Sequence, residues 1–142
     1  MAELRAAPRE NISSGSRLEA AYGYSRAVRV GEMLWIAGTI GMDYAAGTLD
    51  EDPVAQLGQI IRNFQLPLSR AGASLGDIVQ LTTYVASTGV FDAVGPELGR
   101  IFASALPVNT ALVVDFPIKG VKIEIAAVAV IGCGCRGAGT SP

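Results

Sequence analysis

The stretch VKIEIAAVAVI, residues 121–131, decides the fold of this chain. Apolar residues recur at every second position from Ile123 to Ala129, and they alternate with a mixed set that begins with Lys122 and Glu124. Successive side chains of a strand point to opposite faces of a sheet, so the pattern predicts a strand with one wholly apolar face. The other face is mixed but still rich in Ala and Val.

Two further strands are predicted near the N-terminus as a hairpin. The runs 25–30 and 33–37 are rich in strand-forming residues and are separated by the short polar break Gly31-Glu32. Residues 39–52 are punctuated by glycines, which predicts a loop with a brief strand at Thr48-Leu49.

The central part of the chain alternates helix and strand patterns. A helix is predicted from Pro53 to Gly72, because an acidic group precedes the proline and apolar residues then recur at helical spacing. β-Branched residues predict a strand over 77–86, and a second amphipathic helix is predicted over 91–105, ended by Pro107. A strand over 110–116 follows.

The predicted order β-β-α-β-α-β-β describes an α+β domain with two helices on one face of a sheet. We expect residues 1–16 to form a polar lead-in, 17–131 a single domain, and 132–142 a disordered Gly-rich tail. The second sheet face remains uncovered and apolar in a lone protomer, which predicts self-association.

Composition excludes several classes of function. The 142 residues carry 11 Lys and Arg against 13 Asp and Glu, a net charge of -2, so nucleic acid is not an expected partner. The chain has no His, which excludes a histidine-containing catalytic triad and His-ligated zinc. No glycine-rich dinucleotide or phosphate loop is present either, and we expect no cofactor and no metal.

The two cysteines, Cys133 and Cys135, lie one residue apart in the tail, a spacing that fits neither a closed zinc site nor a redox pair. The charged N-terminus does not resemble a signal peptide, and the longest apolar stretch is far shorter than the ~20 residues that cross a bilayer. The sequence therefore predicts a cytoplasmic protein without a membrane partner.

Three stretches resemble signature segments of the Rid family, also called YjgF/YER057c/UK114. They are AVRVG at 27–31 with WIAGT at 35–39, AGASLGDIV at 71–79, and KIEIAA at 122–127. The resemblance spans about residues 11–131. It implies a chorismate-mutase-like protomer with a mixed sheet, a homotrimer packed around a central axis, and small-molecule clefts between subunits.

The resemblance also implies an activity, the hydrolysis of reactive enamines and imines to ammonia and a 2-keto acid. Rid deaminases clamp the substrate carboxylate with an arginine that follows the proline after the second helix, and Asn109 stands at that position here. An amide carries no charge, so we expect a substrate without a clamped carboxylate. Asn109 alternatively serves only as a turn or cap residue.

Two family pocket residues are kept, and they are candidates for catalysis together with Asn109. Tyr24 matches the tyrosine that closes the pocket, and Glu124 matches the glutamate near the attacking water. Because Glu124 lies in an apolar strand, we expect desolvation to raise its pKa, which suits an acid or base near neutral pH. The alternative is an ion pair of Glu124 with a lysine or with an arginine of another subunit.

Five residues are candidates for substrate binding, and Arg26 and the two aromatic residues also have a plainer alternative. Arg26 shares the strand face of Tyr24 and is a candidate for a relocated positive charge, or it is a surface arginine. The aromatic candidates either line a cleft or belong to the core. The full set is Arg26, Trp35, Thr39, Tyr84 and Thr110.

Three functions remain open at this point. The first is a Rid-like hydrolase that needs no metal; the second is a trimer that binds a metabolite without catalysis; the third is a tailoring enzyme acting on an uncharged biosynthetic intermediate. Ribonuclease activity, also associated with the family, is disfavoured by the negative charge and the missing His.

Overall fold

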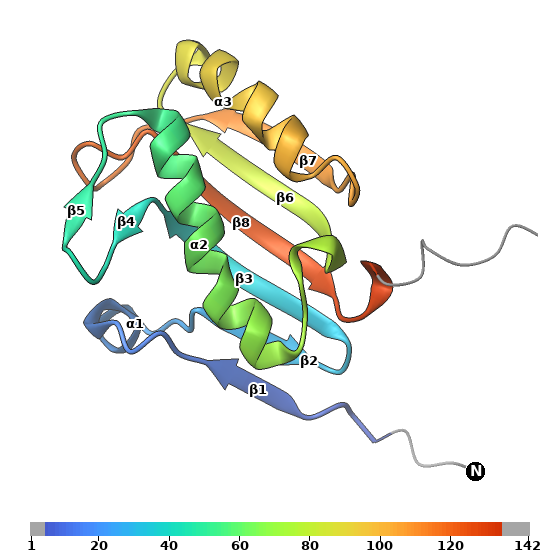
Figure 1. The fold of residues 1–142 in the computed structure, drawn as a ribbon. Helices are drawn as coiled ribbons and strands as arrows, with labels where there is room; N and C mark the ends of the chain where they lie inside the picture. Colours follow the sequence, from blue (N-terminus) through green and yellow to red (C-terminus); the bar gives the residue numbers. More distant parts are fainter. Residues whose placement is uncertain (1–4, 135–142) are drawn as a thin grey trace, which may run out of the picture.

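The computed structural model describes residues 5–134 and shows a mixed sheet with helices packed on one side (Figure 1). Six strands form the main sheet in the order β1-β2-β3-β8-β6-β7, and β4 and β5 form a separate ribbon. In chain order the elements are β1 Arg9–Ile12, α1 Arg17–Tyr22, β2 Ala27–Val30, β3 Met33–Ile40, β4 Met42–Asp43, β5 Thr48–Leu49, α2 Pro53–Ala71, the 3₁₀ turn η1 Leu75–Asp77, β6 Ile78–Val85, α3 Thr88–Ile101, β7 Val108–Val113 and β8 Ile123–Val130.

The last strand occupies the middle of the sheet and confirms the alternating pattern that predicted it. β8 pairs antiparallel with β3 on one side and with β6 on the other, whereas β6 and β7 are parallel. Its residues Ile123, Ile125, Ala127 and Ala129 are buried beneath α2 and α3, and the residues between them are half-buried on the opposite face. The α+β class with two helices on one face is thereby confirmed (Figure 1).

Helix α2 begins and ends where the sequence predicts. The side chain of Asp52 accepts a hydrogen bond from the backbone N–H of Val54, Pro53 takes the first helical position, and Gly72 ends the helix with a φ of 71°. The helix continues through Pro67. Its apolar stripe, which includes Leu57, Ile60, Phe64 and Leu68, is buried against the sheet.

Helix α3 and strand β7 are displaced along the chain from their predicted ranges. Ser87 caps α3 by accepting from the backbone N–H of Val90, so the helix starts three residues before Phe91. The helix ends at Ile101, before its predicted end at Ala105, and β7 then begins at Val108. Asn109 consequently lies inside a strand and is not the turn or cap residue of the alternative interpretation.

The N-terminal segment differs from the expected polar lead-in. Residues 9–12 form β1 at the edge of the sheet, paired with β2, and Ser16 with Glu19 forms a capping box at the start of α1. Ile12 is the one buried residue of β1, so the strand carries almost no apolar pattern. This is why composition alone suggested a lead-in.

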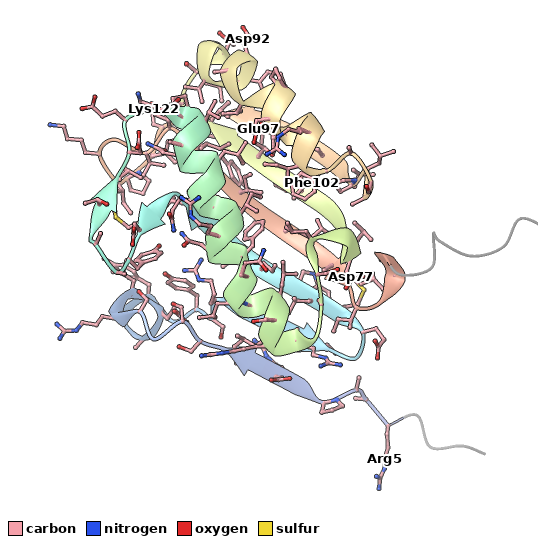
Figure 2. The ribbon with its side chains drawn as sticks, in the orientation of Figure 1. Arg5, Asp77, Asp92, Glu97, Phe102 and Lys122 are labelled. Carbon is pink, nitrogen blue, oxygen red and sulfur yellow. The ribbon has the colours of Figure 1, made fainter. Side chains whose placement is uncertain are left out.

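The C-terminal end of the described chain is held against η1. The backbone N–H of Gly134 donates to Oδ1 of Asp77 over 2.8 Å, and Asp77 lies beside the turn that follows β8 (Figure 2). The expected disorder concerns residues 132–142, of which 135–142, including Cys135, lie outside the described residues. Among residues 5–134 no helix is both long and apolar enough to cross a membrane.

Candidate functional site

Glu124 lies at the centre of the sheet on the face that the helices leave open. It is paired with Ile40 of β3 and Tyr84 of β6, and its neighbours Ile123 and Ile125 point the other way into the core. Burial raises the pKa of Glu124, and the positive charge of Arg26 opposes this only partly. The raised pKa predicted from the apolar strand is thereby confirmed.

A bulge in β3 makes room for the carboxylate of Glu124. The register between β3 and β8 shifts between Ile36 and Thr39, and Gly38 within that shift faces the carboxylate. A Cβ atom at Gly38 would overlap Oε1 of Glu124 and lie 3.1 Å from its Cδ. Because Gly38 has no side chain, it leaves space for the carboxylate of Glu124 on the open face of the sheet.

Arg26 is buried beside this site, which rules out the surface-arginine interpretation. Only 8% of the residue is exposed. Its Nη1 donates to the carbonyl oxygen of Gly38 over 3.1 Å and to Oγ1 of Thr39 over 3.2 Å. Its Cζ lies 5.8 Å from the ring centroid of Tyr24, within cation–π range.

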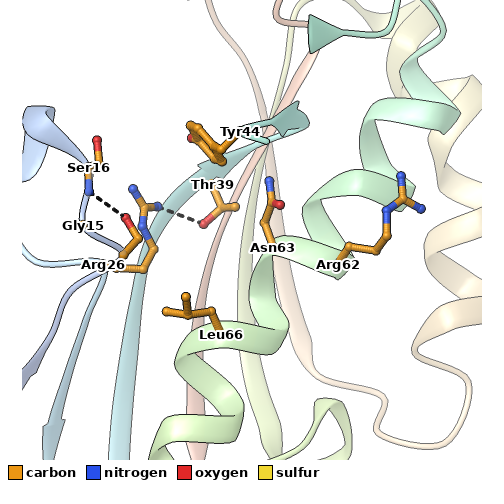
Figure 3. Close-up of a pocket in the computed structure, with 9 residues that line it drawn as sticks. Gly15, Ser16, Arg26, Thr39, Tyr44, Arg62, Asn63 and Leu66 are labelled. Carbon is orange, nitrogen blue, oxygen red and sulfur yellow. Dashed lines mark hydrogen bonds between the residues drawn. The ribbon is translucent and has the colours of Figure 1, made fainter. Parts of the chain in front are cut away.

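Two cavities meet at Arg26. The smaller one, here the Glu124 cavity, has a volume of about 130 Å³ and is lined by Tyr24, Arg26, Gly38, Tyr44 and Glu124 with apolar residues of the 116–121 loop. The larger one, here the α2 cavity, has a volume of about 380 Å³ and lies between the start of α1, β3 and α2 (Figure 3). Arg26 and Tyr44 line both cavities.

Thr39 holds Arg26 in place, and its hydroxyl is already engaged in hydrogen bonds within the protein. It is buried, and its hydroxyl donates to the carbonyl oxygen of Ala37 over 2.9 Å while accepting from Arg26. The structure therefore brings together four of the residues proposed from the sequence, namely Tyr24, Arg26, Thr39 and Glu124.

Asn109 lies elsewhere in the protomer. It is in register with buried Leu81, and its Oδ1 accepts from the hydroxyl of Thr83 over 2.9 Å, on the helix-covered face of the sheet. It lines a groove of about 260 Å³ beneath α3. Glu124 is on the opposite face, so one chain alone does not bring these two candidates together.

The remaining candidates share the open face with Glu124 but lie at different places on it. Trp35 is 43% exposed and lines a separate cavity of about 540 Å³ with Tyr24, which excludes a core role for it in the protomer. Tyr84 is half-buried opposite Glu124, and Thr110 is exposed on β7 in register with Thr82.

Tyr44 is a site residue that the sequence did not single out. It lies in the β4–β5 turn, within a segment predicted only as loop, and it lines both cavities. Partial burial raises the pKa of its phenol, opposed by the charge of Arg26, so the hydroxyl is protonated at neutral pH and can donate a hydrogen bond. No periodicity marks such a residue.

The described part of the chain, residues 5–134, contains no group of three or more His, Cys, Asp or Glu residues that could hold a metal ion. The arrangement can instead hold a small polar molecule between a buried cation and a desolvated carboxyl. The fold and the site together define a class of protein, namely α+β proteins of chorismate-mutase-like fold that carry a small-molecule pocket.

Comparison with known proteins places the chain within this class. The family model described as Endoribonuclease L-PSP matches residues 14–131. The 2-iminobutanoate/2-iminopropanoate deaminase of Capra hircus is 35% identical over 123 residues, 85% of this chain and 90% of the relative. The chain therefore belongs to the Endoribonuclease L-PSP family, also known as the YjgF/UK114 or Rid family, as the sequence resemblance predicted.

Solved structures agree with this assignment. The YjgF/YER057c/UK114 family member Rv2704 of Mycobacterium tuberculosis superposes with a TM-score of 0.78 at 34% identity, covering 87% of this chain and all of that one. The YjgF gene product of E. coli superposes with a TM-score of 0.75 at 29% identity, covering 85% of this chain and 98% of that one.

Proposed function

We propose that this protein hydrolyses a small imine or enamine in the Glu124 cavity, without a metal or cofactor. The observation that carries the proposal is the position of Glu124. Its carboxyl is half-buried, burial raises its pKa, and it has no ion-pair partner within residues 5–134. The deaminase activity named for relatives about 35% identical supports the same chemistry. Small-molecule binding of this kind is the function that the family supports.

The proposed reaction consumes water and releases ammonia. Water adds to the carbon of the C=N bond while the carboxylate of Glu124 accepts a proton from it. The resulting carboxylic acid returns that proton to the nitrogen, which gives a carbinolamine. Glu124 then transfers the hydroxyl proton of the carbinolamine to its nitrogen, the C–N bond breaks as the C=O bond forms, and a ketone or keto acid and ammonia leave. A raised pKa suits Glu124 for both steps, because it brings the two protonation states closer in energy near neutral pH.

We propose further that the pocket is completed in a homotrimer. The open face exposes Tyr24, Trp35 and Leu112, each more than a third accessible, around the half-buried Glu124. Burying such apolar surface favours association. In this arrangement the β7 edge of one subunit, with Asn109 and Thr110, borders the Glu124 cavity of its neighbour. The cytoplasmic location also stays a prediction.

Asn109 favours two alternative functions. An amide replaces the arginine of Rid deaminases and is already bonded to Thr83, so no carboxylate is clamped at this position. The alternatives are therefore a trimer that holds a metabolite without turnover and a tailoring enzyme that acts on an uncharged intermediate. Thermal stabilisation by a ligand without any turnover would favour the binding protein.

The test is ammonia release from freshly generated 2-iminobutanoate. We expect a rate above buffer for the wild type and a loss of at least about 100-fold in Glu124→Gln, because the loss of a general base typically costs ~10²–10⁴. Glu32→Gln, at an exposed glutamate in the β2–β3 turn, is the matched control. A folded wild type with no rate above buffer would rule out the hydrolase.

A further inference from the structure

The guanidinium of Arg26 is a buried positive charge with no carboxylate within ion-pair distance among residues 5–134, although Glu19 accepts from its backbone N–H. The residue is nine-tenths buried, and the ion pair found within residues 5–134 joins Arg100 to Glu97 on the surface of α3. Glu124 is close enough to feel the charge of Arg26, but it is not within ion-pair distance. Burying an unpaired charge is costly, and the residues around Arg26 offset the desolvation of its charge only in part.

Part of the guanidinium is free to bind. Nη1 donates to Gly38 and Thr39, while Nε and Nη2 have no acceptor among the described residues. No fully buried side-chain nitrogen or oxygen in that range lacks a partner, so these two donors reach open space. Figure 3 shows the guanidinium extending between Ser16, Thr39 and Tyr44 at the cavity wall.

Other polar groups of the α2 cavity are already engaged. Asn63 donates to the carbonyl oxygens of Ile40 and Met42, and the hydroxyl of Ser16 accepts from the first turn of α1. Arg62 is exposed, bonded to Gln59, and turned away from Arg26 in Figure 3. Arg26 is therefore the buried cation that a ligand can meet here.

We propose that the free edge of Arg26 binds the carboxylate of the substrate, in place of the arginine that Rid deaminases carry at the position of Asn109. A guanidinium presents paired N–H donors that match the two oxygens of a carboxylate. This proposal rests on the proposed imine hydrolysis. It also revises the expectation of an unclamped substrate, which considered position 109 alone.

The location of Arg26 fits the shape of a 2-imino acid. Such a molecule carries its carboxylate on the carbon next to the C=N bond. The proposal places the carboxylate on Arg26 and the C=N carbon in the Glu124 cavity, because Arg26 lines this cavity as well as the α2 cavity. The tyrosines 24 and 44, which line the same cavity, then enclose the substrate.

The test measures binding to the full chain by calorimetry, with 2-oxobutanoate and its neutral amide as probes. We expect the wild type to bind the keto acid at least about tenfold more tightly than the amide, because hydrogen bonds between charged groups are roughly twice as strong as neutral ones. Arg26→Gln should lose this preference and Arg26→Lys keep part of it. The matched control is Arg17→Gln, at an exposed arginine of α1, which should keep the preference.

Three results would overturn the inference: no preference in the wild type, an unchanged preference in Arg26→Gln, or an unchanged KM of that variant for 2-iminobutanoate. If Arg26→Gln does not fold, the Nε–H resonance of Arg26 in the wild type decides: it should shift with 2-oxobutanoate and not with the amide. The binding assay needs no turnover. An inactive wild type that still selects the keto acid through Arg26 would therefore refute the hydrolase and leave this inference standing.

Discussion

Gly38 faces the carboxylate of Glu124 so closely that no side chain fits between them. The contact arises because the bulge in β3 turns Gly38 toward β8 at the level of the acid. A glycine that is a break in a strand pattern is thus part of the site. It fixes where the carboxylate stands, and it offers a carbonyl oxygen to Arg26 on its other side.

We predict that Gly38→Ala displaces the carboxylate of Glu124. Hydrolysis of 2-iminobutanoate should fall by about 100-fold, since a misplacement of about 1 Å in an active site costs that much. Gly89→Ala, in the first turn of α3 with no tight contact at its Cβ, is the control. A Gly38→Ala enzyme with full kcat/KM and unchanged melting temperature would show that the close approach has no role.

The pH dependence of the rate follows from the direction of the Glu124 pKa. The reaction needs the carboxylate form to take a proton from water, so kcat/KM should rise with pH through a midpoint above 4.5, the usual value for a glutamate. Stopped-flow ammonia detection across pH measures this. An acidic limb that persists unchanged in the residual activity of Glu124→Gln would assign the midpoint to another group.

The stabilisation of the fold by Glu124 should decrease with pH, whereas kcat/KM increases. A glutamate whose pKa is higher in the folded than in the unfolded state stabilises the fold when protonated, and this contribution is lost as pH rises through the folded pKa. Glu124→Gln cannot titrate. We therefore expect the free energy of unfolding of Glu124→Gln, relative to wild type, to increase as pH rises above 4.5, measured by urea denaturation; a constant difference would contradict the raised pKa.

Glu19 provides a prediction for a carboxyl whose pKa is lowered, in contrast to Glu124. Burial raises its pKa, but hydrogen bonds from Ser14 and Ser16 outweigh burial, and the net pKa is lowered. It also accepts from the backbone N–H of Arg26, and so joins α1 to the start of β2. We expect Glu19→Gln to cost about 1.5 to 3 kcal/mol at neutral pH, the usual range for hydrogen bonds to a charged group.

That cost should shrink at low pH. The stabilisation by Glu19 is fully present above 4.5 and is lost as pH falls through its lowered folded pKa. Urea denaturation at several pH values measures this difference, and Glu10→Gln, at an exposed glutamate of β1, is the control. A cost independent of pH would mean that the charge of Glu19 is not what holds α1.

Gln56 joins α2 to the loop before β8. Its side-chain amide donates to the carbonyl oxygens of Asp50 and Gly120 and accepts from the backbone N–H of Lys122. We expect Gln56→Leu to destabilise the protein by about 2 to 4 kcal/mol, because three part-buried backbone groups lose their hydrogen-bond partner at the lower end of ~1–3 kcal/mol each. Gln65→Leu, exposed on the same helix, should be near neutral in thermal denaturation. Equal effects of the two changes would contradict this role.

The parts of the fold with strong local signals were predictable. Pro53 after its acidic group and Gly72 mark the ends of α2, and the period-two pattern marks β8, because these signals act within a few residues. The burial of Arg26 is harder to predict from the sequence, since it depends on contacts with Gly38 and Thr39 across a bulge. Strand β1 and Tyr44 were missed because neither carries a periodic pattern, and their places are set by tertiary packing.

The most direct measurement for the central claim is the titration of the Glu124 carboxyl carbon by NMR in the full-length protein, assigned by comparison with Glu124→Gln. A half-buried acid that serves hydrolysis should titrate above 4.5, at the same pH as the acidic limb of kcat/KM. Titration at or below 4.5, or at a pH unrelated to the rate, would contradict the proposed role of Glu124.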